Sequence, residues 1–378
     1  FTSAYLAHGL MNIMDKSFFG KTGITTDKPV SPYLTWEKTR QYDLGLDMDM
    51  FNYRLNVKLD YYYKYTSSLI YDIPIPGSLY AFGAQVENAM EISNEGLELE
   101  LQADILRESA VSWRMKFNMA RNWNRFEKSY SGKDVVDGDG TLLVVGRPLN
   151  GLYVWAHRGY YNSDAEVPRL YKIDGQEIYF NGVATNGISG AVGDYRLLDL
   201  DGDGNPDSYY AGSPLPLAHG GWVNELMWKN FDLNVLVNFT IGRKMINNRM
   251  GLGFSRQSED GHLTKLFDYR KLRPWDGVNK KPNAPAWGNS LSMNTDSAIE
   301  KVHHLALKQI TLGYNLPDRI SKKAGLSGVR FFLTAENLFY LSNYSGGNPE
   351  VVNIYTGRDN GDTYPLPRKY TLGLTLNF

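Results

Sequence analysis

The chain of 378 residues contains no cysteine. Disulfide bonds, thiol catalysis and thiolate metal sites are therefore excluded, and the absence fits a compartment in which unpaired thiols would be oxidised. No run of about 18 apolar residues occurs, so the sequence predicts no membrane-spanning helix. The formal net charge is -1, which gives no reason to expect a nucleic-acid partner. The class of protein must come from the pattern of side chains along the chain.

No arrangement of catalytic residues stands out. His303 and His304 are adjacent, so on a strand they would point to opposite faces and could not share a metal. Gly20-Lys21-Thr22 lacks the first glycine of a phosphate-binding loop, because Asp15 occupies that position. Paired carboxylates are common on the alternating segments and do not indicate a hydrolase. The sequence therefore predicts a protein that is not an enzyme.

The sequence does contain long, strict alternation of apolar and polar side chains. The last nine residues, 370–378, place apolar residues at even positions and end on an aromatic residue. Such alternation gives a strand one apolar face and one polar face. The same pattern recurs near 42–50, 55–66, 97–105, 111–119 and 231–239.

These segments run to roughly ten to fifteen residues, against the ~5–6 typical of soluble strands and the ~9–11 that a tilted strand needs to cross a bilayer. Most of their polar faces carry two or more ionised groups, which a lumen tolerates only if it is wide and wet. The 26 tyrosines suit interfacial girdles. The predicted fold is an all-β, antiparallel transmembrane β-barrel.

Short turns alternate with long connections, as expected of a barrel with tight turns at one rim and long loops at the other. Tight turns are predicted near 51–54, 107–110, 229–231 and 317–328. Long connections are predicted near 70–92, 130–147, 162–217, 248–302 and 344–369. About ten strands then run from 36 to 378, and residues 1–35 form the tail of a long extracellular loop. The apolar parity changes within 302–316, which predicts a β-bulge near Lys308-Gln309.

An ordered set of short motifs covers about residues 30–378. The set includes Leu34-Thr35-Trp36-Glu37-Lys38-Thr39, Asp43-Leu44-Gly45-Leu46-Asp47, Asn94-Glu95-Gly96-Leu97-Glu98, Gly220-Gly221-Trp222, Gln309-Ile310-Thr311-Leu312-Gly313-Tyr314-Asn315-Leu316-Pro317 and Glu336-Asn337-Leu338. With these motifs the chain resembles the barrel of the SusC/RagA TonB-linked (TonB-dependent) outer-membrane transporters of Bacteroidetes.

The resemblance implies a 22-stranded barrel around an N-terminal plug, a periplasmic segment that engages TonB, and a SusD-like surface lipoprotein as lid. None of the plug, the TonB-binding segment or the lid lies in this sequence. The chain is therefore expected to be the C-terminal part of such a barrel, with residues 36–378 contributing about ten strands.

An acidic, glycine-containing loop is the motif that most specifically indicates a chemical function. Carboxylates and an amide at positions 1, 3, 5, 7 and 9, with glycine at 6, follow the spacing of a calcium loop. The candidate ligands are Asp199, Asp201, Asp203, Asn205 and Asp207. Position 12 is Tyr210, so the bidentate glutamate is absent. Two interpretations stay open, a Ca²⁺ site that stiffens an extracellular loop and an acidic turn that folds without metal.

Aromatic residues crowd the loops and strand ends. Flat rings can stack on sugars or grip peptide side chains while their polar tips stay wet. The substrate-contact candidates are Tyr80, Phe82, Tyr153, Trp155, Tyr160 and Tyr161. For any one of them, packing in a loop or in an interfacial girdle is the alternative. Lumenal charges such as Arg114 and Lys116 could steer substrate, or could pair across neighbouring strands and keep the lumen hydrated.

Together these observations predict active import of an oligosaccharide or peptide across the outer membrane of a Gram-negative bacterium. The expected partners are a SusD-like lipoprotein, TonB, the substrate and outer-membrane lipid. One alternative is a passive pore or surface adhesion barrel without a plug. A less favoured alternative is a soluble glycan-binding β protein, whose apolar faces would pack sheet on sheet.

Overall fold

A computed structural model describes most of the chain. The described residues are 11–18, 20–26, 31–75, 83–107, 109–136, 142–167, 169–171, 177–179, 192–202, 207–247, 273–278, 281–286, 295–351, 353, 355–359, 364 and 366–378. They form two compact units, one of residues 1–47, 58–98 and 122–149 and the other of residues 48–57, 99–121 and 150–378.

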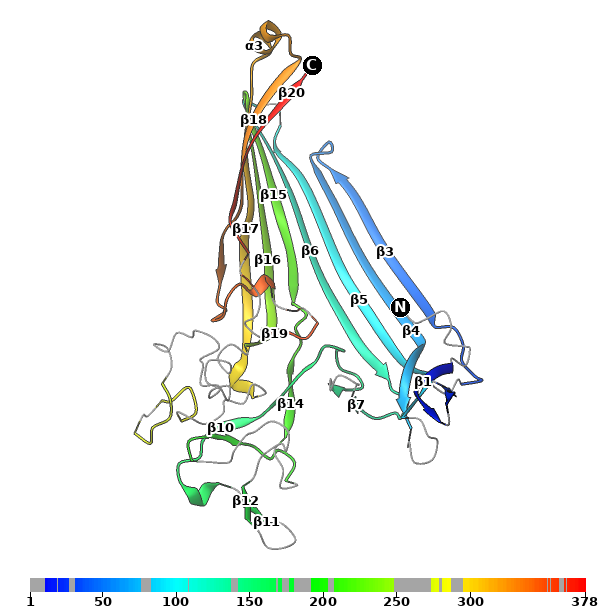
Figure 1. The fold of residues 1–378 in the computed structure, drawn as a ribbon. Helices are drawn as coiled ribbons and strands as arrows, with labels where there is room; N and C mark the ends of the chain where they lie inside the picture. Colours follow the sequence, from blue (N-terminus) through cyan, green and yellow to red (C-terminus); the bar gives the residue numbers. More distant parts are fainter. Residues whose placement is uncertain are drawn as a thin grey trace. The chain divides into compact units, whose positions relative to one another are not determined.

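One ten-stranded sheet dominates, in the order β20-β18-β17-β16-β15-β6-β5-β4-β3, with the short β19 added beside β16 (Figure 1). The pairings from β6 to β20 are all antiparallel. The strands are β3 (Lys38–Met50), β4 (Leu55–Pro74), β5 (Ala84–Leu106), β6 (Val111–Lys128), β15 (Ala218–Trp228), β16 (Phe231–Asn247), β17 (Ile299–Asn315), β18 (Gly328–Ser342), β19 (Arg358–Asp359) and β20 (Lys369–Asn377). The predicted all-β fold of about ten strands is confirmed.

The register places apolar residues beside apolar residues across strand after strand. One continuous row crosses six strands through Leu372, Leu333, Leu312, Leu233, Leu226 and Trp113. The row next to it is polar throughout and consists of Thr371, Thr334, Thr311, Asn234, Glu225 and Arg114. Because neighbouring rows point to opposite sides of a sheet, the sheet has one apolar and one polar face. Half of the Leu333 surface and 82% of the Leu372 surface are exposed on the apolar face.

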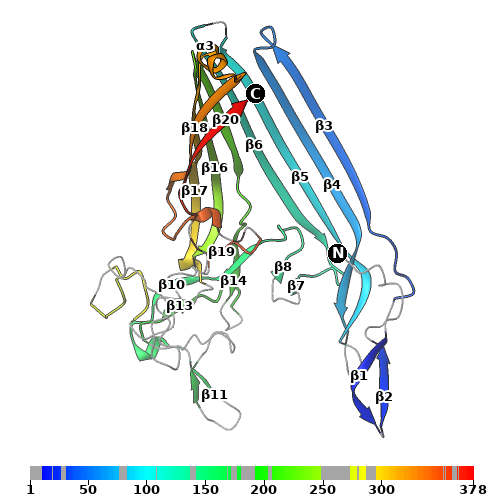
Figure 2. The ribbon, with the colours of Figure 1, turned by 45° about the horizontal axis from the view of Figure 1, so that its top comes forward.

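The tight turns lie where the sequence predicts them, at one end of the second unit (Figures 1 and 2). Phe51, Asn52 and Tyr53 all have positive φ angles, between 55° and 62°, which reverses the chain between β3 and β4. Lys229, with φ of 54°, begins the two-residue turn between β15 and β16. The turn after β17 holds the short helix α3 (Asp318–Ser321) and the 3-10 turn η4 (Lys322–Ala324).

Two sequence predictions about the strands are wrong. The connection expected at 70–92 is mostly strand, since β4 continues to Pro74 and β5 begins at Ala84. Polar residues interrupt the apolar alternation there, and their side chains bond across the strands instead, as when Asn88 donates to the carbonyl of Ser68 at 2.6 Å.

The second error concerns residues 148–161, between the connections predicted at 130–147 and 162–217. The predicted count of about ten strands places a barrel strand there. The observed strands β9 (Leu152–Trp155) and β10 (His157–Tyr160) are four residues each and pair with β14 (Ser208–Gly212) and β13 (Tyr195–Leu197), outside the large sheet. Four residues are too few to cross a bilayer. The long strands therefore number nine among the described residues, with β19 as a short tenth.

The predicted bulge in β17 is confirmed at Lys308. Gln309 pairs with Leu236 and Leu307 with Val237, so Lys308 is left between two ladder positions. The opposing strand is irregular at the same level, where Asn337 adopts a φ of 52°. An unpaired residue in a ladder re-aims its side chain. Here the re-aimed Lys308 contacts Glu350 in the loop that precedes β20.

Glycines on the polar face let side chains meet across an intervening strand. Arg330 of β18 reaches over Gly313 of β17 to Asp232 of β16, with Nη2 2.5 Å from Oδ2. A Cβ atom at Gly313 would overlap both partners. In the other unit Tyr62 of β4 reaches over Gly96 of β5, and its hydroxyl accepts from Asn122 of β6 at 2.5 Å. Both glycines belong to the motifs noted in the sequence, which gives those motifs a structural reason.

Small apolar clusters lie in each unit at the long-connection ends of the strands. Phe126 and Met90 pack with Val135 and Leu143 of a short hairpin, β7 (Val135–Val136) with β8 (Leu142–Leu143). In the other unit Leu152, Val154, Ala211, Ile246 and Ala298 form a second cluster. No helix among the described residues is long and apolar enough to span a membrane.

Residues 11–26 contain a separate hairpin, β1 (Met11–Phe18) with β2 (Lys21–Thr26), which is not part of the large sheet. Another short pair is β11 (Arg169–Tyr171) with β12 (Glu177–Tyr179). The assignment of residues 1–35 to an extracellular loop stays a prediction.

Candidate functional site

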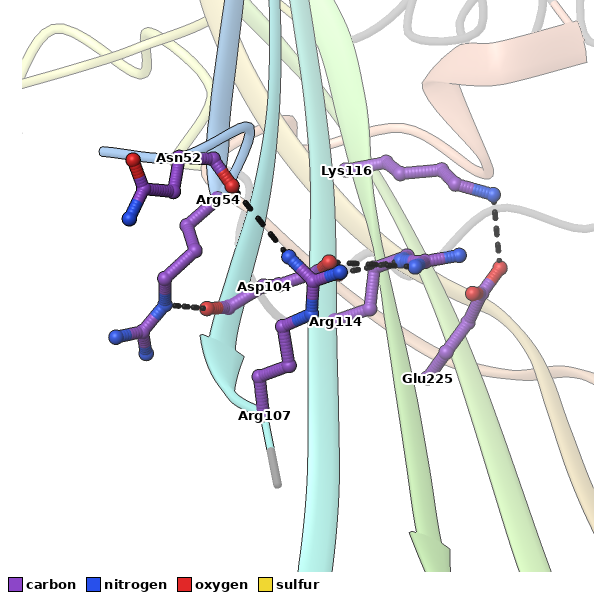
Figure 3. Close-up of polar contacts among 7 residues, drawn as sticks. All are labelled: Asn52, Arg54, Asp104, Arg107, Arg114, Lys116 and Glu225. Carbon is purple, nitrogen blue, oxygen red and sulfur yellow. Dashed lines mark hydrogen bonds and ion pairs between the residues drawn. The ribbon is translucent and has the colours of Figure 1, made fainter. Parts of the chain in front are cut away.

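The polar face carries a network of charged side chains near the tight turns (Figure 3). Arg114 of β6 binds Asp104 of β5 through two contacts, Nε to Oδ1 at 2.6 Å and Nη2 to Oδ2 at 3.4 Å. Lys116 of β6 donates to Glu225 of β15 at 3.0 Å. The prediction that such charges pair across neighbouring strands is thus confirmed for Arg114 and Lys116.

Two further arginines bind backbone carbonyls in the same network (Figure 3). Arg54, in the turn after β3, donates to the carbonyls of Asp104 and Ile105 at 3.3 and 3.0 Å. Arg107 donates to the carbonyl of Asn52 at 3.5 Å. These bonds tie two neighbouring tight turns together. Side chains of Arg114 and Lys116 remain nearly half exposed, so this end of the polar face is charged and hydrated.

The aromatic substrate-contact candidates fall into three situations. Tyr80 and Phe82 lie outside the described residues. Tyr153 and Trp155 are half-buried on β9, and the Tyr153 ring lies 5.6 Å from that of Tyr210. Tyr161 is buried with only 5% of its surface exposed. Contact with substrate stays a prediction for all six.

Tyr160 belongs to a packed aromatic cluster in a long connection. Its ring stacks on that of Tyr195 with centroids 5.3 Å apart, and the His157 ring meets the edge of Tyr195 at 4.5 Å. Burial raises the pKa of the Tyr160 and Tyr195 hydroxyls above their usual range. His157 also contacts Asp296, which accepts a bond from Tyr209 at 3.2 Å. The cluster thus orders the connection, a role that the sequence offered as the alternative.

The acidic loop brings three of its five predicted ligands together. One carboxylate oxygen from each of Asp199, Asp201 and Asp207 lies within 4.8 Å of the others. Asp203 and Asn205 lie outside the described residues. Asp207 accepts from the backbone of Leu200 at 2.5 Å, and Asp199 from Gly202 at 2.6 Å. These bonds brace the turn under either interpretation, with calcium or without it.

Calcium binding by this loop is a testable prediction. Asp201→Asn in the intact protein is expected to weaken binding about tenfold or more, because Ca²⁺ affinity depends on the number of charged oxygen ligands. Terbium luminescence, followed by competition with Ca²⁺, measures that affinity. Asp164→Asn, in another exposed turn, is the matched control. Equal terbium affinity in wild type and Asp201→Asn would contradict the calcium site and favour the acidic turn without metal.

Sequence reasoning missed a second polar cluster, beneath the loop between β18 and β20. Glu350 lies between two basic side chains, with Oε2 2.9 Å from Nζ of Lys308 and Oε1 3.3 Å from Nε2 of His304. These contacts lower the pKa of the Glu350 carboxyl from its usual range to about 2. The buried hydroxyl of Tyr344 in the same loop donates to Asp359 at 2.7 Å. Only the parity change at Lys308 could have hinted at this cluster.

A cavity of about 240 Å³ opens beside Glu350. Its polar lining comprises Lys308, Asn337, Asn348, Glu350 and Arg368, and its apolar lining includes Leu307, Phe339 and Leu366. The lining comes from β17, β18 and the loop before β20, all within the second unit. A cavity with several convergent polar groups on an apolar wall is the usual form of a small-ligand site.

The two-faced sheet, the tight turns at one end and the hydrated charges on the polar face define an outer-membrane β-barrel. The chain belongs to the family of TonB dependent receptor-like β-barrels, whose model matches residues 14–210. Membership places the chain in the outer membrane.

Individual relatives agree with this family. The chain is 30% identical to the TonB-dependent receptor P26 of Formosa agariphila over 95% of this chain and 36% of the receptor. It is 27% identical to the TonB-dependent receptor SusC of Bacteroides thetaiotaomicron over 95% of this chain and 34% of that receptor. The chain thus spans about a third of the length of these curated relatives.

Among solved structures, the chain resembles that of the RagAB peptide transporter, with a TM-score of 0.75 and 23% identity. The likeness covers 99% of this chain and 39% of that one. The structure of the RagAB peptide importer in the "open-open" state gives a TM-score of 0.73 at 22% identity. At these identities the likeness supports the fold alone.

Proposed function

We propose that this chain is the C-terminal part of the barrel of a TonB-dependent importer that moves an oligosaccharide or peptide across the outer membrane. The observation that carries the proposal is the two-faced sheet, with an apolar row on one side and a polar row on the other across six strands. Combined with membership of the receptor family, this arrangement supports a wall between lipid and a wet lumen.

In the proposed mechanism the barrel binds solute from outside without covalent chemistry and is not an enzyme. The chain supplies a hydrated wall, on which paired charges such as Arg114 with Asp104 keep water in the lumen. Gating would come from a plug drawn by TonB, and capture would involve a SusD-like lipoprotein. Both partners are proposed from the resemblance to SusC and to RagAB, which is described as a peptide transporter.

Energised uptake tests this proposal. The gene for the intact protein is deleted in its source bacterium, and uptake of labelled peptide and glycan pools is compared with that of the complemented strain. Uptake of a component should require the gene and should stop when a protonophore collapses the proton motive force. Gene-dependent uptake that continues with the protonophore would instead establish the passive pore, and surface binding without uptake the adhesion barrel.

A further inference from the structure

From the cavity beside Glu350, we propose a binding site for a carboxylate group of the transported solute, formed by Lys308 and Arg368. This inference rests on the proposed import function and adds the chemical class of the solute. The source of the carboxylate is either the C-terminus of a peptide or the uronic acid of a glycan.

Charge at the cavity favours an anion. The cavity lining holds two permanent cations, Lys308 and Arg368, against the single carboxylate of Glu350. Arg368 is exposed at the cavity wall, and no carboxylate of the described residues lies within ion-pair distance of it. The lining therefore has an excess of one positive charge, which attracts an anion more strongly in a partly enclosed cavity than in bulk water.

The guanidinium of Arg243 on β16 is buried behind the loop that carries Glu350. Only 7% of this residue is exposed. Its Nη1 donates to the carbonyl of Pro349 at 3.4 Å, and its Nε and Nη2 have no partner. No carboxylate among the described residues pairs with it. A buried charge without a counter-charge is costly unless an anion approaches, so Arg243 adds positive potential directly behind the loop that carries Glu350.

The site already holds one carboxylate. The Glu350 carboxylate lies 2.9 Å from Nζ of Lys308 and 3.3 Å from Nε2 of His304. The same two groups could bind another carboxylate in the same way. Its low pKa keeps it ionised at ordinary pH. An incoming carboxylate would bind Arg368 and compete with Glu350 for Lys308. Leu366, in the loop before β20, would contact the part of the solute next to its carboxylate.

Binding to the intact, detergent-solubilised protein tests the site. The probes are penta-alanine with a free C-terminus against its C-terminal amide, and tetragalacturonate against its neutral methyl ester. A titration calorimeter measures the dissociation constants. We expect one acidic probe to bind, and its neutral form to bind about tenfold more weakly or worse, as for loss of a charge-assisted hydrogen bond. The pair that shows this difference identifies the source of the carboxylate.

Three variants and one control locate the binding. Lys308→Met and Arg368→Gln should each weaken binding of the acidic probe about tenfold. Glu350→Gln should strengthen its binding, because a competing carboxylate is removed. Lys369→Gln is the matched control, since Lys369 is the next residue and pairs with Glu336 at 3.5 Å. A gain of affinity in Glu350→Gln cannot arise from misfolding.

Several results would overturn the inference. These are equal binding of acidic and neutral probes, wild-type affinity in both Lys308→Met and Arg368→Gln, or no gain in Glu350→Gln. The inference is also overturned if none of the four probes binds. If gene-dependent, protonophore-sensitive uptake is still observed, the importer proposal stands and only the carboxylate site fails.

Discussion

Leu333→Arg is expected to destabilise the folded barrel by about 2–4 kcal/mol, the cost of a lipid-facing arginine near the bilayer midplane. Leu333 lies in the apolar row between Leu312 and Leu372, and half of its surface is exposed. It lies five positions along the chain from Gly328, at the tight-turn end of β18. At a rise of about 3.4 Å per residue and a tilt of about 45°, that is roughly 12 Å, half of the ~25 Å apolar band.

Thr334→Arg is the control, because Thr334 follows Leu333 directly but lies in the polar row beside Thr311 and Thr371. An arginine there meets water, so a change within about 1 kcal/mol is expected. Unfolding of the intact protein in lipid vesicles with guanidinium chloride measures both variants. Equal destabilisation by the two arginines would contradict the assignment of one face to lipid.

The sequence predicts the parts of the fold in which the immediate surroundings of each residue determine its type of side chain. The strand at 370–378 was predictable because lipid on one side and water on the other impose a period of two on every residue. The bulge at Lys308 was predictable for the same reason, since an inserted residue must reverse the parity of the residues after it. The turn at 51–54 was predictable from its length and polarity.

The errors lie in segments where lipid and water no longer impose an alternation of apolar and polar side chains. The ends of β4 and β5 away from the tight turns were missed because their pairs are held by side-chain bonds, such as that from Asn88 to the carbonyl of Ser68, and the apolar period is lost. β9 and β10 pair with residues about 35 to 60 positions away, which no local pattern reveals. The long connections are constrained by their own packing and not by lipid.

The candidate sites show the same division. The acidic loop at 199–207 is contiguous in the chain, so its spacing alone brought three carboxylates into one group. The cavity beside Glu350 is assembled from Lys308, Asn337 and Arg368, which lie on two strands and a loop. A single sequence does not show that Arg243 is buried beneath Pro349, because that depends on how the loop folds back on the sheet. Sites that depend on tertiary contacts need the structure.

Gly220→Val is expected to cause the second large loss of stability. Gly220 belongs to the Gly220-Gly221-Trp222 motif and lies where neighbouring strands of the sheet approach closely. Gly220 of β15 pairs with Met119 of β6 and with Phe239 of β16. A Cβ atom at Gly220 would overlap the backbone oxygen of Asn118 and lie 2.9 Å from the Cα atom of Met119. Backbone atoms in a paired strand cannot rotate away as a side chain can. We therefore expect a loss of about 3 kcal/mol or more, at the upper end of overpacking.

Gly83→Val is the matched control, since a Cβ atom there meets nothing within 4 Å and its φ is not left-handed. The same vesicle assay should show Gly83→Val near wild type and Gly220→Val with a lower unfolding midpoint or no folded fraction. Similar stability of the two variants would mean that β6 and β15 are not paired in this register. A selective loss in Gly220→Val would show that the Gly220-Gly221 motif exists because the backbones of β6, β15 and β16 approach too closely for any side chain. That close pairing joins β6 to the strands that come after it, so the wall of the proposed importer depends on it.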